Sequence, residues 1–277
     1  MSEFSSEWLD LREAADARAR NTEIANALAA RFTLRDDLSI LDLGSGTGAN
    51  LRGTAQLLPV RQTWTLVDRD AALLNTARTK LIRWAERHTI DGDALELEKG
   101  GRKIRVVFKS ADLAHETTAL IAEGAQLVTA SAFFDLTSES YIRDLAKAVV
   151  AAKAAFYATL VYNGLQKWTP HRPADNQMTA AFQRHQMRDK GFGPAAGPLA
   201  ASHLVDQFRI NGYVALAGES PWRLDRADRM LIEELVRGHA VAVAEDGGVD
   251  DKTIVSWVNV PRGAAFVGHT DIFAAPQ

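Results

Sequence analysis

A short apolar segment that runs directly into alternating glycines is the first feature of this sequence with chemical potential. Residues 41–48 read Leu-Asp-Leu-Gly-Ser-Gly-Thr-Gly, and the residues from 49 to 58 have the composition of a helix that stops at Pro59. Glycines accept positive φ angles and close backbone approach, and the first turn of a helix exposes free N–H groups. A strand, a glycine turn and a helix in this order predict a nucleotide-type binding site.

Taken alone, the glycine turn fits a nicotinamide dinucleotide as one possible cofactor. Gly44, Gly46 and Ala49 satisfy the G-x-G-x-x-A form of that fingerprint. Asp68 stands at the distance at which the fingerprint carries an acid that binds ribose. An NAD(P)-dependent oxidoreductase is therefore one alternative.

Three features together favour another cofactor. The glycines of the turn alternate three times and Asp42 precedes them, residues 67–70 form an acidic strand end, and Asp112 follows the third predicted strand. In these features the chain resembles class I S-adenosylmethionine-dependent methyltransferases, from about residue 38 to 163 and again at its last strands. The resemblance implies methyl transfer from S-adenosyl-L-methionine to a small-molecule acceptor by in-line displacement.

The resemblance also implies roles for single residues. Asp42 orders the glycine loop or meets the cofactor ammonium, Asp68 accepts from both ribose hydroxyls, and Asp112 accepts from the adenine amino group. Arg20, on the N-terminal helix, either pairs with the cofactor carboxylate or belongs to a solvated helix face. The implied cofactor-binding residues are Asp42, Gly44, Ser45, Gly46, Gly48, Asp68, Arg69, Asp112, Leu113, Ser131 and Arg20.

The reacting groups should come from the ends of the fourth and fifth predicted strands. A displacement at a sulfonium methyl needs an aligned acceptor, exclusion of water and, for most acceptors, removal of a proton. Asp135 and Tyr162 follow these two strands and are predicted catalytic residues. Residues 131–135 lack the N/D-P-P-Y/F pattern of enzymes that methylate nucleobases or glutamine amides, which counts against those acceptors.

His185 is the third predicted catalytic residue, because a histidine can act as a general base near neutral pH. It stands four residues before Asp189 on a predicted helix, so the two share one face. They form either a catalytic pair or an ordinary surface pair. No tight cluster of histidines and acids accompanies them, and the sequence predicts no metal site.

The elements that position these residues alternate between strand and helix. This pattern predicts an α/β fold with a doubly wound, mostly parallel, seven-stranded Rossmann-like sheet. We expect one domain over 1–277, with an N-terminal helical segment at 1–37 and a helical insertion at 165–201 that caps the substrate site. The expected strands are 39–43, 63–68, 104–108, 125–130, 154–160, 213–217 and a last one from 265–267 and 271–274; the expected helices are 7–31, 49–58, 71–87, 138–152, 175–188, 204–210 and 225–245.

Composition narrows the class of protein. The 277 residues include no cysteine, which excludes disulfides, thiolate metal sites and a cysteine nucleophile. The net charge of -3 gives no support to a nucleic-acid partner, RNA included, and leaves a protein acceptor as a further alternative. The polar N-terminus and the absence of long apolar runs predict a cytoplasmic protein without a signal peptide or membrane span.

No residue in the sequence is an unmistakable catalytic base. A non-catalytic S-adenosylmethionine-binding module therefore stands as a further alternative to an enzyme. The sequence carries no signal for the oligomeric state.

Overall fold

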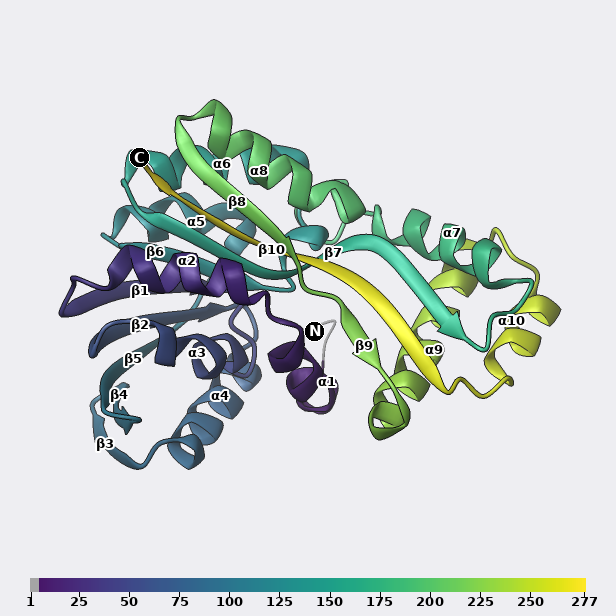
Figure 1. Ribbon diagram of the computed structural model, residues 1–277, viewed down its shortest axis with the longest axis horizontal. Coiled ribbons are helices and arrows are strands. Elements are labelled where there is room, and N and C mark those ends of the chain that lie inside the picture. The colour runs from purple at the N-terminus through teal and green to yellow at the C-terminus, as the bar shows by residue number, and fades with distance from the viewer. Residues whose placement is uncertain (1–4) are drawn as a thin grey trace.

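Ten strands form one twisted sheet in the computed structural model, which describes residues 5–277 (Figure 1). Residues 1–4, part of the N-terminus predicted to lack a signal peptide, lie outside the described residues. The strands are β1 (Asp37–Leu43), β2 (Arg61–Asp68), β3 (Arg87–Asp91), β4 (Ala94–Lys99), β5 (Arg102–Ser110), β6 (Leu127–Ser131), β7 (Ala155–Thr169), β8 (Tyr213–Glu219), β9 (Trp222–Leu224) and β10 (Ala264–Pro276).

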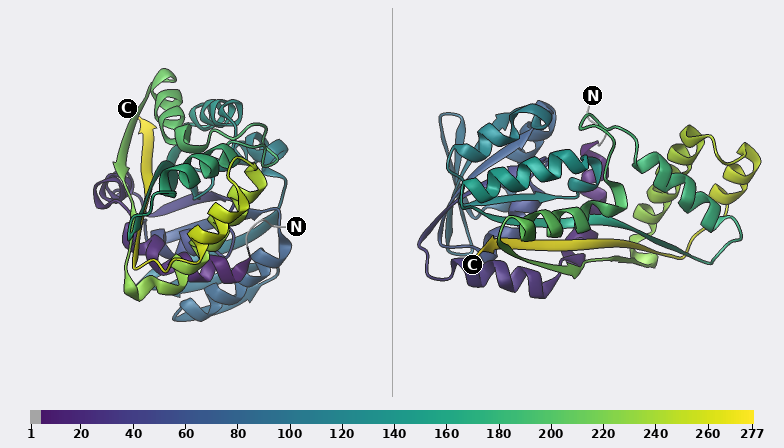
Figure 2. Two further views of the ribbon diagram at one scale, coloured as in Figure 1. Left: turned by 90° about the vertical axis from the view of Figure 1, so that its right-hand side faces the viewer. Right: turned by 90° about the horizontal axis from the view of Figure 1, so that it is seen from above.

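Helices cover both faces of this sheet (Figure 2). Within residues 5–277, no helix combines the length and the apolar composition needed to cross a bilayer. The α-helices are α1 (Ser6–Ala19), α2 (Thr22–Phe32), α3 (Ala49–Thr54), α4 (Ala71–Trp84), α5 (Leu113–Ala122), α6 (Glu139–Ala151), α7 (Asp175–Gln186), α8 (Ala200–Ile210), α9 (Arg229–Asp246) and α10 (Asp251–Val258).

The strand order is β3-β4-β5-β2-β1-β6-β7-β10-β8, with β9 paired to β10. The five central strands, from β5 to β7, run parallel, and the chain winds outward from β1 in both directions. This arrangement confirms the predicted doubly wound α/β fold. All seven predicted strands are present, and β3, β4 and β9 add to them, so the expected number of strands was too small.

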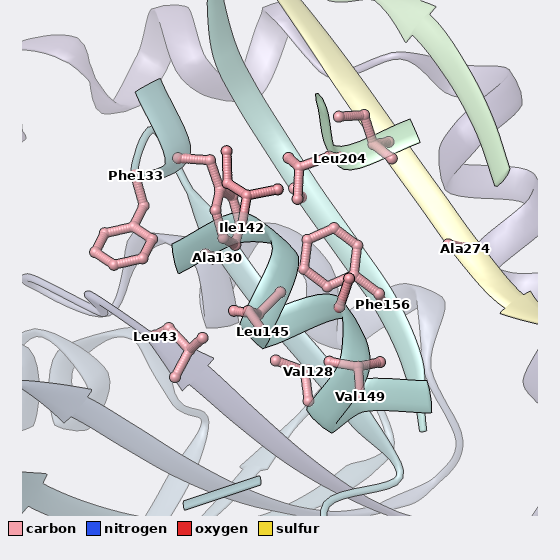
Figure 3. Close-up of a cluster of buried hydrophobic side chains, with 14 of the residues drawn as sticks. Leu43, Val128, Ala130, Phe133, Ile142, Leu145, Val149, Phe156, Leu204 and Ala274 are labelled. Carbon is pink, nitrogen blue, oxygen red and sulfur yellow. The ribbon is translucent and has the colours of Figure 1, made fainter. Parts of the chain in front are cut away.

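The apolar side chains of β1 point alternately to the two faces of the sheet and contribute to a separate hydrophobic core on each face. Leu41 and Leu43 face the core beneath α5, α6 and α8, whereas Leu38 and Ile40 face the core beneath α2, α3 and α4. Successive side chains of a strand point to opposite faces, and this period of two separates the cores. Figure 3 shows the first core, where the side chains of α6 pack against those of β6 and β7.

The expected single helix over 7–31 is two helices that meet at Arg20 and Asn21. Arg20 has ψ 132°, which ends α1, and Asn21 begins α2 as its N-cap by accepting a hydrogen bond from the backbone N–H of Ile24 at 3.1 Å. An asparagine that caps the following turn competes with continued helix, which the apolar period alone did not reveal.

Other differences lie at the edges of the fold. The β3–β4 hairpin escaped prediction because every side chain of β3 is exposed, so it has no apolar alternation. The last strand, expected in two pieces, is the continuous β10. Helix α10 was not predicted, and neither was α5, which connects β5 to β6.

Strands β7 and β10 continue beyond the sheet as a ribbon, to which β9 adds a short third strand, and α7, α9 and α10 pack there as a helical lobe (Figures 1 and 2). The lobe has its own apolar core. The segment expected as a separate cap, 165–201, thus supplies α7 to a lobe whose other helices come from residues 229–258.

A buried ion pair stands at the centre of the helical lobe. An Arg262 Nη atom lies 2.8 Å from Asp175 Oδ1, and the two side chains are 0% and 6% exposed. The indole of Trp257 donates to the same carboxylate at 2.7 Å, and the guanidinium lies 4.9 Å from the centre of that ring. Every charge in this centre has a partner, as burial requires.

Asp175→Ala should lower the free energy of unfolding by about 3–5 kcal/mol, because it leaves the Arg262 charge buried without its partner. Urea unfolding followed by circular dichroism measures the change. Asp250→Ala is the matched control, since Asp250 caps α10 in the same lobe at the surface and its loss costs about 1 kcal/mol. Equal losses for the two variants would contradict the central role of the pair.

Candidate functional site

The glycine turn lies where the sheet changes its winding direction, between the end of β1 and the start of α3. Gly44, Gly46 and Gly48 all have positive φ, at 63°, 52° and 75°. A Cβ atom on Gly44 would lie 2.9 Å from the ring of Phe133, so the backbone passes close beneath the end of β6. Ligands of doubly wound sheets bind at this edge, outside the carboxyl ends of the strands.

A cavity of about 700 Å³ opens above this turn. Its walls come from the glycine turn, from the ends of β2, β5 and β6, from α1, and from the loop at 190–192. Asp42 and Gly48 lie outside the lining. The predicted cofactor-binding residues that line it are Arg20, Gly44, Ser45, Gly46, Asp68, Arg69, Asp112, Leu113 and Ser131.

Asp68 fixes the geometry of the turn. One carboxylate oxygen accepts from Gly46 N at 2.9 Å, and the other accepts from Asp70 N at 2.9 Å. Burial raises the pKa of this carboxyl above its usual range. Asp112 stands across the cavity as the N-cap of α5, where it accepts from Ala114 N at 3.0 Å.

Asp42 lies beneath the turn and is completely buried. Its Oδ1 accepts from Asn50 Nδ2 at 2.8 Å, while Oδ2 has no partner among the described residues. Asn50 Nδ2 also donates to Thr129 Oγ1 on β6 at 3.0 Å. Asp42 thus joins the end of β1 to α3 through Asn50.

Arg20 reaches the cavity from the junction of α1 and α2. Its two terminal nitrogens donate to Thr54 Oγ1 at 2.7 Å and to Asn50 Oδ1 at 2.9 Å. Both partners are neutral side chains of α3. Burial raises the pKa of Asp42 and of Asp271, and the positive charge of Arg20 works against both shifts, so the guanidinium faces these two acids as well as the cavity.

Helix α1 lies between the sheet and the helical lobe, over the cavity (Figure 1). On the side of the sheet, Glu13 pairs with Arg52 of α3 at 2.7 Å. On the side of the lobe, Asp16 accepts from the indole of Trp222 at 3.0 Å, and Arg18 pairs with Asp228 at 2.6 Å. Polar contacts thus hold the helix on both sides.

Two residues other than glycine have positive φ on adjacent strands near the cavity, one just after β6 and one within β7. Ala132, which lines the cavity after β6, has φ 50°, and Leu160 of β7 has φ 57°. The N–H of Ala132 donates to the carbonyl of Thr159 at 2.9 Å, which joins the two strained positions. Backbone strain of this kind concentrates at functional sites.

Asp135 and Tyr162, two predicted catalytic residues, lie behind this wall. Asp135 belongs to the short 3-10 helix η2 (Phe134–Leu136), between Phe133 and Leu136, which both line the cavity. It is buried, its Oδ1 has no partner in the described part of the chain, and burial raises its pKa to about 6. The buried hydroxyl of Tyr162 also has no hydrogen-bond partner among these residues.

The structure adds residues that the sequence did not single out. The ring of His269 on β10 lies 6.3 Å from that of Tyr162 and 5.0 Å from that of Trp222. Burial, assisted by the charge of Arg12, lowers the pKa of His269 to about 3, so the imidazole is neutral. Arg12 lines the cavity, pairs with Asp16 at 2.9 Å and lies over Trp222. The i,i+4 spacing of Arg12 and Asp16 was the available signal.

His185 occupies a different place from the one predicted. Its Nε2 lies 2.8 Å from Glu245 Oε2 within the helical lobe, and it does not line the cavity. Asp189 accepts instead from the N–H groups of Gly191 and Gly193 at 2.7 and 3.0 Å, so the predicted His185–Asp189 pair does not form. Across residues 5–277, no group of three or more acids and histidines is arranged for a metal.

The loop after α7 does reach the cavity. Phe192 lines it and stacks edge-on against Phe133 at 5.5 Å and Tyr141 at 5.0 Å between ring centres. The segment expected to cap the site thus contributes this aromatic contact and the adjoining Lys190 and Gly191, whereas α7 itself packs in the lobe against α9.

Burial of Asp42 has a measurable consequence for stability, because burial raises its pKa to about 7 from an unfolded value of 3.8. The folded protein then binds this proton more tightly, so the free energy of unfolding falls as pH rises between these values. Asp42→Asn removes the titration. The difference in free energy of unfolding between the variant and wild type should therefore shift in favour of the variant by about 1–3 kcal/mol when the pH is raised from about 5 to about 8.

Urea unfolding at the two pH values measures this gain. The control is Asp36→Asn, whose side chain is 87% exposed and whose stability difference from wild type should be the same at both pH values. A constant difference for Asp42→Asn as well would show that Asp42 does not titrate in this range.

Comparison with known proteins gives a family match for the part of the chain that runs from β1 to β6. Residues 40–130 match the family model of a methyltransferase domain. This segment contains the glycine turn, Asp68 and Asp112. No curated protein matches the chain in sequence.

Solved structures share the fold over nearly the whole chain. The cyclopropane-fatty-acyl-phospholipid synthase-like protein from Lactobacillus casei has a TM-score of 0.54 at 14% identity, and the match covers 95% of this chain and 91% of that one. The cyclopropane synthase MmaA2 from Mycobacterium tuberculosis gives 0.53 at 10% identity, with 99% and 95% covered. The YcgJ protein from Bacillus subtilis gives 0.50 at 12% identity, with 93% and 99% covered. Residues 40–130 are therefore similar in sequence to a methyltransferase domain, and the chain as a whole has the Rossmann-like methyltransferase fold.

Proposed function

We propose that the cavity binds S-adenosyl-L-methionine and that the chain methylates a small-molecule acceptor. The observation that carries the proposal is the convergence of the glycine turn, Asp68, Asp112 and Arg20 on one cavity within a methyltransferase fold. Its volume of about 700 Å³ lies in the range of small-molecule sites, about 300–1,000 Å³.

The residues of the cavity fit the parts of this cofactor. Each oxygen of Asp68 already accepts one backbone N–H and retains a lone pair, so the carboxylate can take both ribose hydroxyls. Asp112 and Leu113 suit the adenine as a polar and an apolar contact. Arg20 suits the terminal carboxylate, because a guanidinium binds a carboxylate through two parallel hydrogen bonds.

When bound, the cofactor supplies an electrophilic methyl group on a sulfonium. The chain must then orient the acceptor, exclude water and remove a proton. Asp135 suits the last task, because a carboxyl with a pKa of about 6 is largely ionised at neutral pH and still basic enough to take a proton. Leu136, Phe133 and Phe192 form apolar walls that keep water out.

The charges near Asp135 favour a polar acceptor without a net negative charge. Arg12 is already paired with Asp16, and the imidazole of His269 is neutral. Asp135 adds a carboxyl group whose Oδ1 has no partner among the described residues. An amine or a hydroxyl compound, which can donate a hydrogen bond to this group, therefore fits the site, and His185 has no part in this proposal because it lies in the helical lobe.

Cofactor binding is tested by calorimetric titration with S-adenosylhomocysteine. Asp68→Ala should weaken binding about tenfold or more, because two ribose hydroxyls lose their acceptor and the glycine turn loses the hydrogen bond that Gly46 N donates to Asp68. Asp36→Ala, an exposed aspartate at the opposite end of the sheet, is the control and should bind like wild type. Wild-type protein that binds no S-adenosylhomocysteine would refute the proposed cofactor.

Catalysis is tested with radiolabelled S-adenosylmethionine against a panel of amines and hydroxyl compounds. With an acceptor that turns over, Asp135→Asn should lower kcat about 100-fold with little change in the KM for the cofactor. The wild-type rate should fall as pH drops below about 6, where Asp135 takes up its proton, and the variant should lack this limb.

Asp144→Asn, an exposed substitution on α6, serves as the control for this experiment. A variant at position 135 with wild-type kcat would remove Asp135 from the mechanism. Cofactor binding without turnover of any acceptor in the panel would favour a non-catalytic binding module.

A further inference from the structure

Asp271 on β10 is a fully buried carboxylate outside the cavity lining. Its Oδ1 accepts from Leu160 N at 2.8 Å, and its Oδ2 accepts from Asn21 N at 2.8 Å. The carboxylate therefore joins β10 to β7 and to Asn21, the N-cap of α2. A fully buried acid costs stability unless both oxygens are hydrogen-bonded, and these two contacts meet that requirement.

The contact with Leu160 exists because β7 bulges there. Thr270 pairs with Val161 and Ile272 pairs with Ala158, so two residues of β7 stand opposite Asp271. The φ of 57° at Leu160 belongs to this bulge. A bulge leaves an N–H group without its strand partner, and the carboxylate of Asp271 accepts it.

The contact with Asn21 fixes the junction of α1 and α2 from one side. From the other side, Asn21 Nδ2 donates to Glu219 O of β8 at 2.9 Å. The space for that side chain exists because residue 218 is a glycine, whose added Cβ would lie 2.5 Å from Asn21 Nδ2. Asn21 is thus held between β10 and β8.

Arg20 immediately precedes this anchored residue. Its guanidinium packs directly on Gly53, where an added Cβ would lie 2.9 Å from Arg20 Cζ. A shift of the junction would therefore move Arg20 away from Thr54 and Asn50, the two side chains that orient it in the cavity.

We propose that Asp271 is a positioning residue for the cofactor site, which sets the place of Arg20 through the backbone of Asn21. The proposal rests on the proposed function, in which Arg20 takes the terminal carboxylate of the cofactor. Asp271 touches no ligand in this arrangement. It acts only on the part of the site that receives the amino-acid end of the cofactor.

Two ligands separate this role from a general structural one. S-adenosylhomocysteine carries the terminal carboxylate, whereas 5′-methylthioadenosine has the same adenosine and thioether without it. Asp271→Asn replaces one accepting oxygen by an NH₂ group that faces a backbone N–H. The variant should bind S-adenosylhomocysteine about tenfold more weakly and 5′-methylthioadenosine within about twofold of wild type in calorimetric titrations.

Arg20→Ala should reproduce this selective loss. Asp175→Asn is the control for lost stability, because it removes a buried carboxylate from the helical lobe and should change neither affinity. Equal weakening of both ligands by Asp271→Asn, or no weakening of S-adenosylhomocysteine while Arg20→Ala weakens it, would overturn the proposal. If Arg20→Ala has no effect, the assigned role of Arg20 fails, and the proposal for Asp271 fails with it.

Gly218→Ala provides a second route if Asp271→Asn does not fold. The added Cβ displaces Asn21 from the β8 side and leaves Asp271 intact. It should show the same selective loss of S-adenosylhomocysteine binding, and unchanged binding of both ligands would count against the junction. Wild-type protein that binds neither ligand would refute the proposed cofactor site itself, which is a separate outcome.

Discussion

The antiparallel pairing of β10 with β7 is the interaction on which the rest of the structure depends. It extends from Ala274 opposite Phe156, deep in the sheet, to Ala264 opposite Thr169, at the far end of the ribbon. One end of the pair completes the core beneath α6 and α8, and the other supports the helical lobe. Because one ladder serves both, a change of register would move the lobe and the buried residues beside the cavity together.

The register of the β7–β10 pairing shifts at two places, and buried polar side chains lie at both of them. Opposite Asp271, β7 carries the bulge at Leu160, and next to His269 the register shifts again. Asp271 is satisfied there by two backbone N–H groups, whereas Asp135, Tyr162 and His269 keep polar atoms without partners among the described residues. The lobe contains such atoms too, because Arg262 Nε, Trp168 Nε1 and His239 Nε2 have no partner among the described residues, although Arg262 and Asp175 pair through other atoms. Unpaired buried polar groups cost stability, so the irregular part of the ladder and the lobe both carry this cost.

The sequence was most informative where structure is local. The glycine turn, Asp68 and Asp112 could be predicted because short apolar strands followed by glycine or acid specify their own geometry, and the family match covers the same segment. Arg12, His269 and Asp271 could not be found this way. The residues that they contact are distant in sequence, since Asp271 accepts from Asn21 and Leu160 and His269 lies beside Tyr162, and these contacts form only because β10 pairs with β7 across a long insertion. His185 shows the converse error, since its nearest acid in sequence was Asp189 but its partner in space is Glu245.

Helices α1 and α2 adjoin in sequence but are held in different ways. Helix α2 buries Ile24, Leu28 and Phe32 in the core, whereas α1 fully buries only Ala15. The partly buried Trp8, Leu11 and Ala19 of α1 also pack against the core of the lobe. Its other anchors are ion pairs and hydrogen bonds, and pairs at exposed side chains contribute about 0–1 kcal/mol each. Displacement of α1 would therefore cost less than displacement of α2. Asn21, which Asp271 anchors, marks the boundary between the weakly held α1 and the firmly held α2. Arg20 therefore lies directly between this anchored residue and α1, the helix that covers the cavity.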